Sequence, residues 1–331
     1  MNNDFFKAYV VTENGEKFNA SVQQRTLSDL PQGDLVVRVS YSSLNFKDAL
    51  SAAGNRGVTK RYPHTPGIDA VGRVVQSNST RFSVGDEVIV TGFDLGMNTA
   101  GGFAEFIRIP NQWALPLPQG LTAKEAMILG TAGLTAALSV HKLRLFVNPT
   151  DGPIGVSGAT GGVGSLAIAI LHQLGYEVIA ISGKNTDKHF LKSIGASAII
   201  DRHDFNAPTP KPMLSSYLGG AIDTVGGTIL DNFIKLTKAE GAITCCGNAA
   251  SGDLNLTVYP FILRGISLLG IDSQNCPIPT RKLLWTNLAT TWKPIKLMDM
   301  YQEIPLDRLN DAMARMRQGM SRGRTIVNLN A

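Results

Sequence analysis

The octet S-G-A-T-G-G-V-G at residues 157–164 limits the fold of this 331-residue chain more than any other stretch. An apolar run at residues 154–157 precedes the glycines, and residues 162–174 have the pattern of a helix that begins inside the octet. A strand, a glycine turn and a helix in this order begin a βαβ unit. The first N–H groups of such a helix lack internal partners, so they form a phosphate site together with the helix dipole. A tight turn without a ligand is the alternative interpretation.

Short apolar strands alternate with helical segments beyond the octet. The predicted strands are 176–181, 198–200, 221–225, 242–245 and 267–271, and the predicted helices are 186–194 and 228–236. Strands that are apolar throughout indicate a parallel sheet covered on both faces. Right-handed crossovers then give a doubly wound α/β fold. The sequence therefore predicts a Rossmann domain over residues 126–295.

Residues 1–125 have a different pattern, with short alternating runs such as 35–39 and 87–90 between turns. This pattern predicts a compact β-rich domain. Thr122 and Glu125 form a capping box at the start of a buried helix. A helix near 306–317 and a strand at 324–329 close the chain, and we expect this last strand to return to the first domain. Residues 296–331 are therefore assigned with residues 1–125.

The end of the second strand indicates which dinucleotide binds. The fingerprint reads Ala159-x-Gly161-x-x-Gly164, and about 20 residues on an NAD site carries Asp or Glu. This chain has Ile181-Ser182-Gly183-Lys184 there, with no carboxylate. A hydroxyl and a cation suit a 2′-phosphate, and Arg202 can add a bidentate contact. The sequence predicts NADPH rather than NADH.

Metal and nucleic-acid functions find little support in the composition. Three cysteines without a C-x-x-C pair, and five histidines without an i, i+4 pair, do not suggest a zinc site. The net charge of +5 is mild, and no basic patch interleaves with aromatic residues, so we expect no nucleic-acid partner. The arginines near the C-terminus indicate either a solvated helix face or a phosphate-binding edge; they are Arg315, Arg317, Arg322 and Arg324. The sequence shows no signal-peptide pattern and no long charge-free apolar segment, so we expect a cytoplasmic protein without a membrane span.

Several separate blocks resemble one family. They are S-S-L-N-F-K-D-A-L (42–50), P-G-I-D-A-V-G (66–72), G-T-A-G-L-T-A (130–136), G-A-T-G-G-V-G (158–164), A-I-D-T-V-G-G (221–227), P-F-I-L-R (260–264) and G-I-D-S (270–273). Together they resemble the zinc-free, quinone-oxidoreductase-like branch of the medium-chain dehydrogenase/reductase superfamily, and in particular NADPH-dependent acryloyl-CoA reductases. The resemblance implies an α/β protein with a GroES-like domain and a Rossmann domain. Zinc-dependent members carry Gly-His-Glu where this chain has Gly67-Ile68-Asp69.

The resemblance also implies cofactor contacts. Phe46 falls beside the nicotinamide, although close relatives often have Tyr there. Thr160, Gly161, Gly162 and Val163 fall on the pyrophosphate turn; Ser182, Gly183, Lys184 and Arg202 fall on the adenosine phosphate; Asn248, Ile262, Ser273 and Arg324 match later cofactor positions. Asn248 stands where an apolar residue is usual, so its contact is expected through the backbone. The strand at 267–271 resembles the edge through which relatives form homodimers.

Without a zinc site, alcohol oxidation has no Lewis acid, which leaves reduction of an activated C=C bond or of a quinone. The resemblance alone implies the substrate, a 2-enoyl thioester, with NADPH-dependent reduction of acryloyl-CoA giving propanoyl-CoA. The alternatives are an NADPH:quinone oxidoreductase and an NADPH-binding structural or RNA-binding protein without turnover. The developing enolate oxygen needs hydrogen-bond donors, and Asn45 is the candidate donor or orienter, with Asp48 orienting a donor or acting through water. Both types of residue also cap helix starts, which is the alternative role for each.

Overall fold

The computed structural model describes residues 5–330 of the chain, without the side chain of Asn185. The fold divides into two compact units. Unit 1 comprises Met1–Thr131, Gln274–Ala289 and Leu297–Ala331, and unit 2 comprises Ala132–Ser273 and Thr290–Lys296. The segment 274–289 lies in unit 1, whereas the predicted limits include it in the Rossmann domain. The domain limits themselves stay a prediction.

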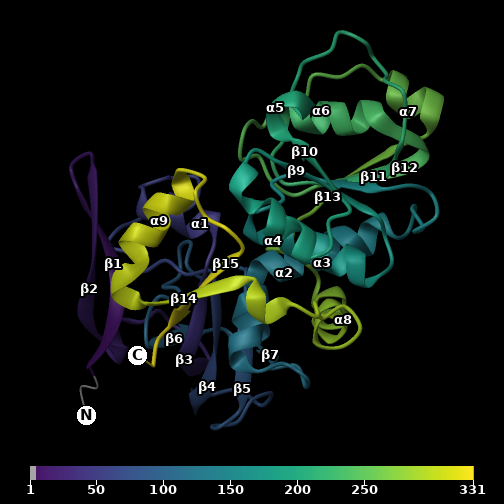
Figure 1. Ribbon diagram of the computed structural model, residues 1–331. Coiled ribbons are helices and arrows are strands. Elements are labelled where there is room, and N and C mark those ends of the chain that lie inside the picture. The colour runs from purple at the N-terminus through teal and green to yellow at the C-terminus, as the bar shows by residue number, and fades with distance from the viewer. Residues whose placement is uncertain (1–4, 331) are drawn as a thin grey trace. The chain divides into compact units, whose positions relative to one another are not determined.

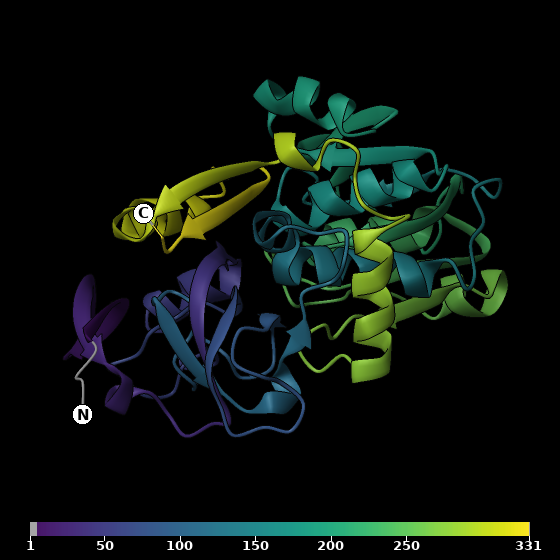
Figure 2. The ribbon, with the colours of Figure 1, turned by 90° about the horizontal axis from the view of Figure 1, so that it is seen from below.

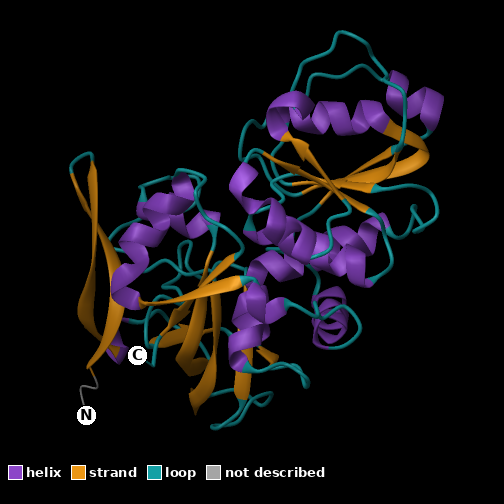
Figure 3. Ribbon diagram, in the orientation of Figure 1, coloured by secondary structure: helices purple, strands orange, loops and turns teal. Residues whose placement is uncertain are grey.

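Unit 2 is built on a parallel six-stranded sheet with the order β10-β9-β8-β11-β12-β13 (Figure 1). Its elements are β8 (Ile154–Val156), α3 (Gly162–Gln173), β9 (Val178–Ser182), η3 (Asn185–Asp187), α4 (Lys188–Ser193), β10 (Ala198–Asp201), α5 (Arg202–Phe205), β11 (Leu218–Asp223), α6 (Gly227–Leu236), β12 (Thr237–Cys245), α7 (Tyr259–Arg264) and β13 (Ser267–Gly270). Helices α3 and α4 cover one face of the sheet, and α5, α6 and α7 cover the other (Figures 1 and 3). The strand order reverses between β8 and β11, which confirms the doubly wound Rossmann fold.

Unit 1 is β-rich, as predicted. Its elements are β1 (Phe5–Asn14), β2 (Lys17–Thr26), η1 (Leu27–Asp29), β3 (Leu35–Leu44), α1 (Phe46–Ala52), β4 (Asp69–Ser77), β5 (Glu87–Thr91), β6 (Phe106–Ile109), η2 (Asn111–Trp113), β7 (Leu115–Pro116), α8 (Ile278–Ala289), η4 (Leu297–Asp299), β14 (Tyr301–Pro305), η5 (Leu306–Arg308), α9 (Leu309–Arg317) and β15 (Arg324–Asn328). A seven-stranded sheet has the order β14-β15-β3-β4-β5-β7, with β6 on β3, and β1 and β2 form a separate hairpin. Figure 2 shows β14 and β15 side by side. Because β15 pairs with β3, the last strand does return to the first domain.

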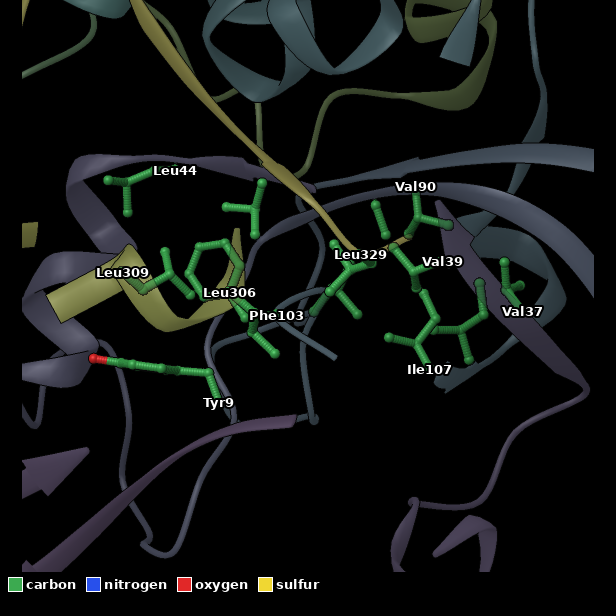
Figure 4. Packing of buried hydrophobic residues seen from close by; sticks show 14 of the residues in the cluster. Tyr9, Val37, Val39, Leu44, Val90, Phe103, Ile107, Leu306, Leu309 and Leu329 are labelled. Carbon is green, nitrogen blue, oxygen red and sulfur yellow. The ribbon is translucent and has the colours of Figure 1, made fainter. Parts of the chain in front are cut away.

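The core of unit 1 gathers apolar side chains from both ends of the chain. Val37 and Val39 of β3 share one cluster with Ile107 of β6 and with Leu309 and Leu329 near the C-terminus, and Leu329 lies next to Val39 (Figure 4). Tyr9 is the polar exception: its ring lies in this cluster and its hydroxyl points away from the other labelled side chains (Figure 4). Residues far apart in sequence thus share one core, which holds the C-terminal segment to the first domain.

Helix α2 (Ala123–Leu143) begins in unit 1 and continues into unit 2. It is long and apolar enough to cross a membrane by length and composition alone, but 83% of its most apolar window is buried within the protein, as in a core helix. The helix is interrupted at Gly130, where φ is 52° and ψ is −154°. A Cβ at this position would lie 2.6 Å from Oδ2 of Asp69 and 2.5 Å from Oγ of Ser43. Gly130 is therefore required both by its backbone conformation and by the close approach of two side chains.

We predict that Gly130→Ala lowers the free energy of unfolding by about 3 kcal/mol or more, from backbone strain together with the clash. The matched control is Gly85→Ala, because Gly85 also has a positive φ of 100° but has nothing within 4 Å of its added Cβ. The control should cost only the strain, about 1–2 kcal/mol. Urea unfolding of both variants measures the difference, and equal losses would contradict the close-contact argument.

Candidate active site

The glycine turn of unit 2 connects β8 to α3 and is shaped for an anion. Gly158 has a φ of 55°, and a Cβ on Gly164 would lie 2.4 Å from the carbonyl oxygen of Gly158. Gly161 is the N-cap of α3, and among the described residues no side chain caps this helix start. The first N–H groups of α3 therefore point out of the turn without a side-chain acceptor, which is the arrangement that binds a pyrophosphate. Thr160, Gly162 and Val163 lie on this same turn, as predicted.

A buried aspartate holds the glycine turn against the neighbouring strand. Oγ of Ser157 donates to Oδ1 of Asp223 at 2.7 Å and accepts from the N–H of Thr224 at 2.8 Å. Asp223 also accepts the N–H of Gly226 at 2.8 Å. Burial raises the pKa of the Asp223 carboxyl, while the hydrogen bond from Ser157 opposes this rise. The contacts fix the turns after β8 and β11 side by side, and the sequence analysis had not singled out Asp223.

The predicted adenosine-phosphate residues come together at the ends of β9 and β10. Ser182 lies beside Asp201 in the parallel register, and Arg202 follows directly. The guanidinium of Arg202 lies against Gly183, where an added Cβ would come 3.0 Å from Nε. The N–H of Lys184 donates to Oγ of Ser182 at 3.1 Å. A hydroxyl, a backbone N–H group and a guanidinium therefore lie around one glycine, which is a donor set suited to a phosphate.

A carboxylate that the sequence analysis passed over, Asp201, also lies at this edge. Its Oδ1 accepts the N–H of His203 at 2.8 Å and so caps the short helix α5. The sequence did carry a signal for this role: Asp201 directly precedes Arg202, which was assigned to the phosphate, and stands at the start of a short helix. The capping bond gives Asp201 a structural role beside the predicted phosphate site.

Asn248 and Ser273, two of the later cofactor positions, lie at the carboxyl edge of the sheet. Asn248 follows β12 in a loop that packs on the turn after β11, since a Cβ on Gly247 would lie 2.3 Å from the carbonyl oxygen of Thr224. Ser273 follows β13 and hydrogen-bonds Thr135 at 2.7 Å. These two positions are compatible with a cofactor laid along this edge.

Ile262 lies on α7, where its side chain is 68% exposed. The C-terminal end of α7 is tied to the amino end of β12, because Nη1 of Arg264 donates to the carbonyl oxygens of Lys235 and Thr237. The contact of Ile262 with a cofactor stays a prediction.

Asn45 and Asp48 of unit 1 form a capping box at the start of α1. The backbone N–H of Asn45 donates to Oδ2 of Asp48 at 2.8 Å. Oδ1 of Asp48 accepts the N–H groups of Gly67 and Ile68, both at 3.0 Å. Asp48 is fully buried. These contacts give Asp48 the capping role, and its role in orienting a donor or acting through water stays a prediction.

The amide of Asn45 is also fully engaged. Its Nδ2 donates to Oδ2 of Asp69 at 2.8 Å and to the carbonyl oxygen of Ser43 at 3.1 Å. Its Oδ1 accepts from Nη2 of Arg324 at 3.3 Å. Both amide protons are therefore used within the protein, and the role of Asn45 as donor or orienter stays a prediction. Phe46, the next residue, is 46% exposed at the first position of α1 and is available to pack against a ligand.

The buried carboxylate of Asp69 joins four elements of unit 1. Its oxygens accept from Oγ of Ser43 at 2.6 Å, and from the backbone N–H and the hydroxyl of Thr131 at 2.9 and 2.5 Å. Arg324 lies 4.0 Å from Oδ2 and donates to the carbonyl oxygens of Ile128 and Leu44 at 3.0 and 3.3 Å. Burial lowers the pKa of Arg324, and the Asp69 carboxylate opposes this. The Arg324 side chain bonds protein groups, and its contact with a cofactor stays a prediction.

Zinc does not fit the described residues. No group of three or more His, Cys, Asp or Glu side chains within residues 5–330 is placed to hold a metal ion. Buried Ile68 stands where zinc-dependent members carry histidine. The neighbouring carboxylate of Asp69 accepts from Nδ2 of Asn45 at 2.8 Å.

Comparison with known proteins places the chain in a family. Residues 31–119 match the alcohol dehydrogenase GroES-like domain, and residues 162–288 match the zinc-binding dehydrogenase family. The acrylyl-CoA reductase AcuI of Ruegeria pomeroyi is 39% identical over 98% of this chain and 100% of its own. A Bacillus subtilis protein, "Putative quinone oxidoreductase YhfP", is 40% identical over 98% of this chain and 99% of its own. The chain therefore belongs to the medium-chain dehydrogenase/reductase family.

Solved structures agree with this assignment. The yhdH oxidoreductase of Salmonella enterica in complex with NADP has a TM-score of 0.95 at 40% identity, covering 97% of this chain and 99% of its own. The Bacillus subtilis protein yhfP with NAD bound has the same TM-score and identity, covering 98% of this chain and 99% of its own. The Rossmann and GroES-like assignments are thus confirmed, and relatives of similar identity have been solved with different nicotinamide cofactors.

We predict that Asp48→Asn lowers the free energy of unfolding by about 2–4 kcal/mol, because the amide would direct N–H groups at buried backbone N–H groups. Asp86→Asn is the matched control. Asp86 accepts the N–H of Ser83 at 2.8 Å with the same three-residue spacing but at an exposed position. The control should cost less than about 1 kcal/mol. Equal losses in urea unfolding would contradict the buried role of Asp48.

The stability contributed by Asp48 should depend on pH. Burial raises the pKa of Asp48 to about 7, the Asp69 carboxylate adds to the rise, and three backbone N–H groups oppose it. An unfolded aspartate has a pKa of about 3.9, so the folded protein binds this proton more tightly. The resulting stability is present in acid and is lost as the pH rises through 7. The difference in unfolding free energy between the wild type and Asp48→Asn should therefore shrink between about pH 4 and pH 7, and a constant difference would contradict the raised pKa.

Proposed function

We propose that the protein catalyses the NADPH-dependent reduction of the activated C=C bond of a 2-enoyl thioester, with acryloyl-CoA giving propanoyl-CoA. The substrate class rests on one observation, the 39% identity to AcuI over essentially the whole of both chains. NADPH supplies a hydride for the β-carbon of the thioester when it is bound. A reductase of this kind matches the absence of a fitting zinc site among residues 5–330, since alkene reduction does not depend on a Lewis acid.

The residues of unit 2 would hold NADPH in two places. The first N–H groups of α3, on the turn 158–164, would bind the pyrophosphate. Ser182, Lys184 and Arg202 would bind the 2′-phosphate, because the Ser182 hydroxyl and the Arg202 guanidinium lie next to Gly183, and Lys184 follows directly in the chain. This set distinguishes NADPH from NADH, which lacks the phosphate. In unit 1 the capping box of α1 would hold Phe46 in place as a packing surface for the nicotinamide.

A quinone reductase is the second candidate, because YhfP carries that name at 40% identity. We further infer a homodimer that pairs through β13, an edge strand of the six-stranded sheet. We also infer a cytoplasmic location and no nucleic-acid partner.

One assay separates the enoyl-thioester reductase from the quinone reductase. It tests acryloyl-CoA, crotonyl-CoA and a set of quinones, each with NADPH and with NADH. Oxidation of NADPH by the enoyl thioesters supports the proposal, and oxidation by quinones alone supports the second candidate. No turnover with any substrate would favour the NADPH-binding structural or RNA-binding alternative.

We predict that Arg202→Ala raises the KM for NADPH by about 10- to 100-fold, because a charge-assisted hydrogen bond to phosphate is lost. The KM for NADH should change by less than about twofold, since NADH has no phosphate at this position. Lys192→Ala is the control, because Lys192 is an exposed cation of unit 2 on α4. Steady-state kinetics with both cofactors checks this, and an equal effect on NADPH and NADH would exclude the 2′-phosphate role of Arg202.

A further inference from the structure

A cavity of about 330 Å³ in unit 1 has no part in the function proposed above. It lies between the β1–β2 hairpin, α1 and α9, three elements that Figure 1 shows as neighbours. None of the predicted cofactor-binding or catalytic residues lines it. Its walls are made largely of small side chains, which leave the space open: Ala20, Ala49, Ala52, Ala53 and Ala314. The volume falls at the lower end of the range for small-molecule sites, roughly 300–1,000 Å³.

The polar groups in the inner part of the cavity already bond one another. The hydroxyl of Tyr9 donates to Oδ1 of Asn310 at 2.5 Å, and Nδ2 of Asn310 donates to the carbonyl oxygen of Ala20 at 3.2 Å. These polar groups satisfy one another and tie the hairpin to α9. Phe18 and Met313 complete the lining with apolar surface. The interior therefore suits an apolar group more than a phosphate or a sugar.

Two opposite charges border the same cavity. Glu16 comes from the turn of the hairpin and Arg317 from the end of α9, and both side chains are exposed. Within the described part of the chain neither has an ion pair, whereas Lys124 and Glu303, also of unit 1, pair at 2.8 Å. A ligand with one charge would leave the opposite charge unmatched, and a phosphate would meet the Glu16 carboxylate. A zwitterion satisfies both groups.

We propose that this cavity binds a small zwitterionic amino acid with an apolar side chain. Glu16 takes the ammonium group, Arg317 takes the carboxylate, and the alanine-lined interior takes the side chain. The site is independent of the reductase reaction, so its test uses binding and not turnover.

Isothermal titration calorimetry of the full chain with saturating NADPH present tests the site, using L-phenylalanine and L-leucine as probes. At least one of them should bind at one site per chain, and should also raise the Tm by a few degrees at saturation. For a phenylalanine site, 2-phenylethylamine and 3-phenylpropanoate each lack one charge and should bind at least about tenfold more weakly. For a leucine site, 3-methylbutylamine and 4-methylpentanoate serve in the same way. Absence of binding by both amino acids, or equal binding by the singly charged analogues, overturns the proposal.

Variants assign the binding to this cavity. Arg317→Gln and Glu16→Gln should each weaken amino-acid binding at least about tenfold. Ala314→Leu should abolish it by filling the space. Arg315→Gln is the matched control, since Arg315 is exposed on the same helix but does not line the cavity, and its binding should equal that of the wild type. The Tm of each variant without ligand verifies its fold, and unchanged binding in both charge variants overturns the assignment.

Discussion

The buried carboxylate of Asp69 is the group on which the arrangement of unit 1 depends. A buried charge is costly unless it is paired and hydrogen-bonded, so the chain must bring donors to it. They come from Ser43 at the end of β3, from Asn45 before α1, and from Thr131 after the break in α2, with Arg324 of β15 close by. The same requirement accounts for Gly130, whose missing Cβ makes room for the carboxylate. The first long segment of unit 1 ends at Thr131, the residue that Asp69 holds.

A second buried aspartate does comparable work in unit 2. Asp223 binds Ser157 and Gly226, and so aligns the turns that follow β8 and β11. In both units the buried carboxylates fix the position of the backbone through hydrogen bonds. Asp69 and Asp48 fix the start of α1, where exposed Phe46 lies. Asp223 fixes the glycine turn. This division suits a reductase in which the cofactor carries the reactive chemistry and the protein contributes position and electrostatics.

The sequence predicted the strand and helix order of unit 2 well, because apolar strands and a glycine turn are local signals. The limits predicted from the octet agree with those of β8 and α3 to within a residue or two. Ser182 and Arg202 lie close together because neighbouring parallel strands end at the same edge of the sheet. Long-range contacts were not predictable: Arg324 donates to residues 196 and 280 positions away, and the break at Gly130 follows from the nearby Asp69 and Ser43. The sequence alone left the role of Asn45 open, because an amide that caps a helix and one that binds an enolate are the same residue type.

The central claim is that this protein moves a hydride from NADPH to the β-carbon of an enoyl thioester without a metal. The most direct measurement uses crotonyl-CoA and NADPH with both hydrogens at C4 of the nicotinamide replaced by deuterium, with protein pretreated with a chelator. The account predicts butanoyl-CoA with one deuterium at C3, formed at the rate of untreated protein. Butanoyl-CoA without deuterium at C3, or turnover only after zinc is restored, would contradict it.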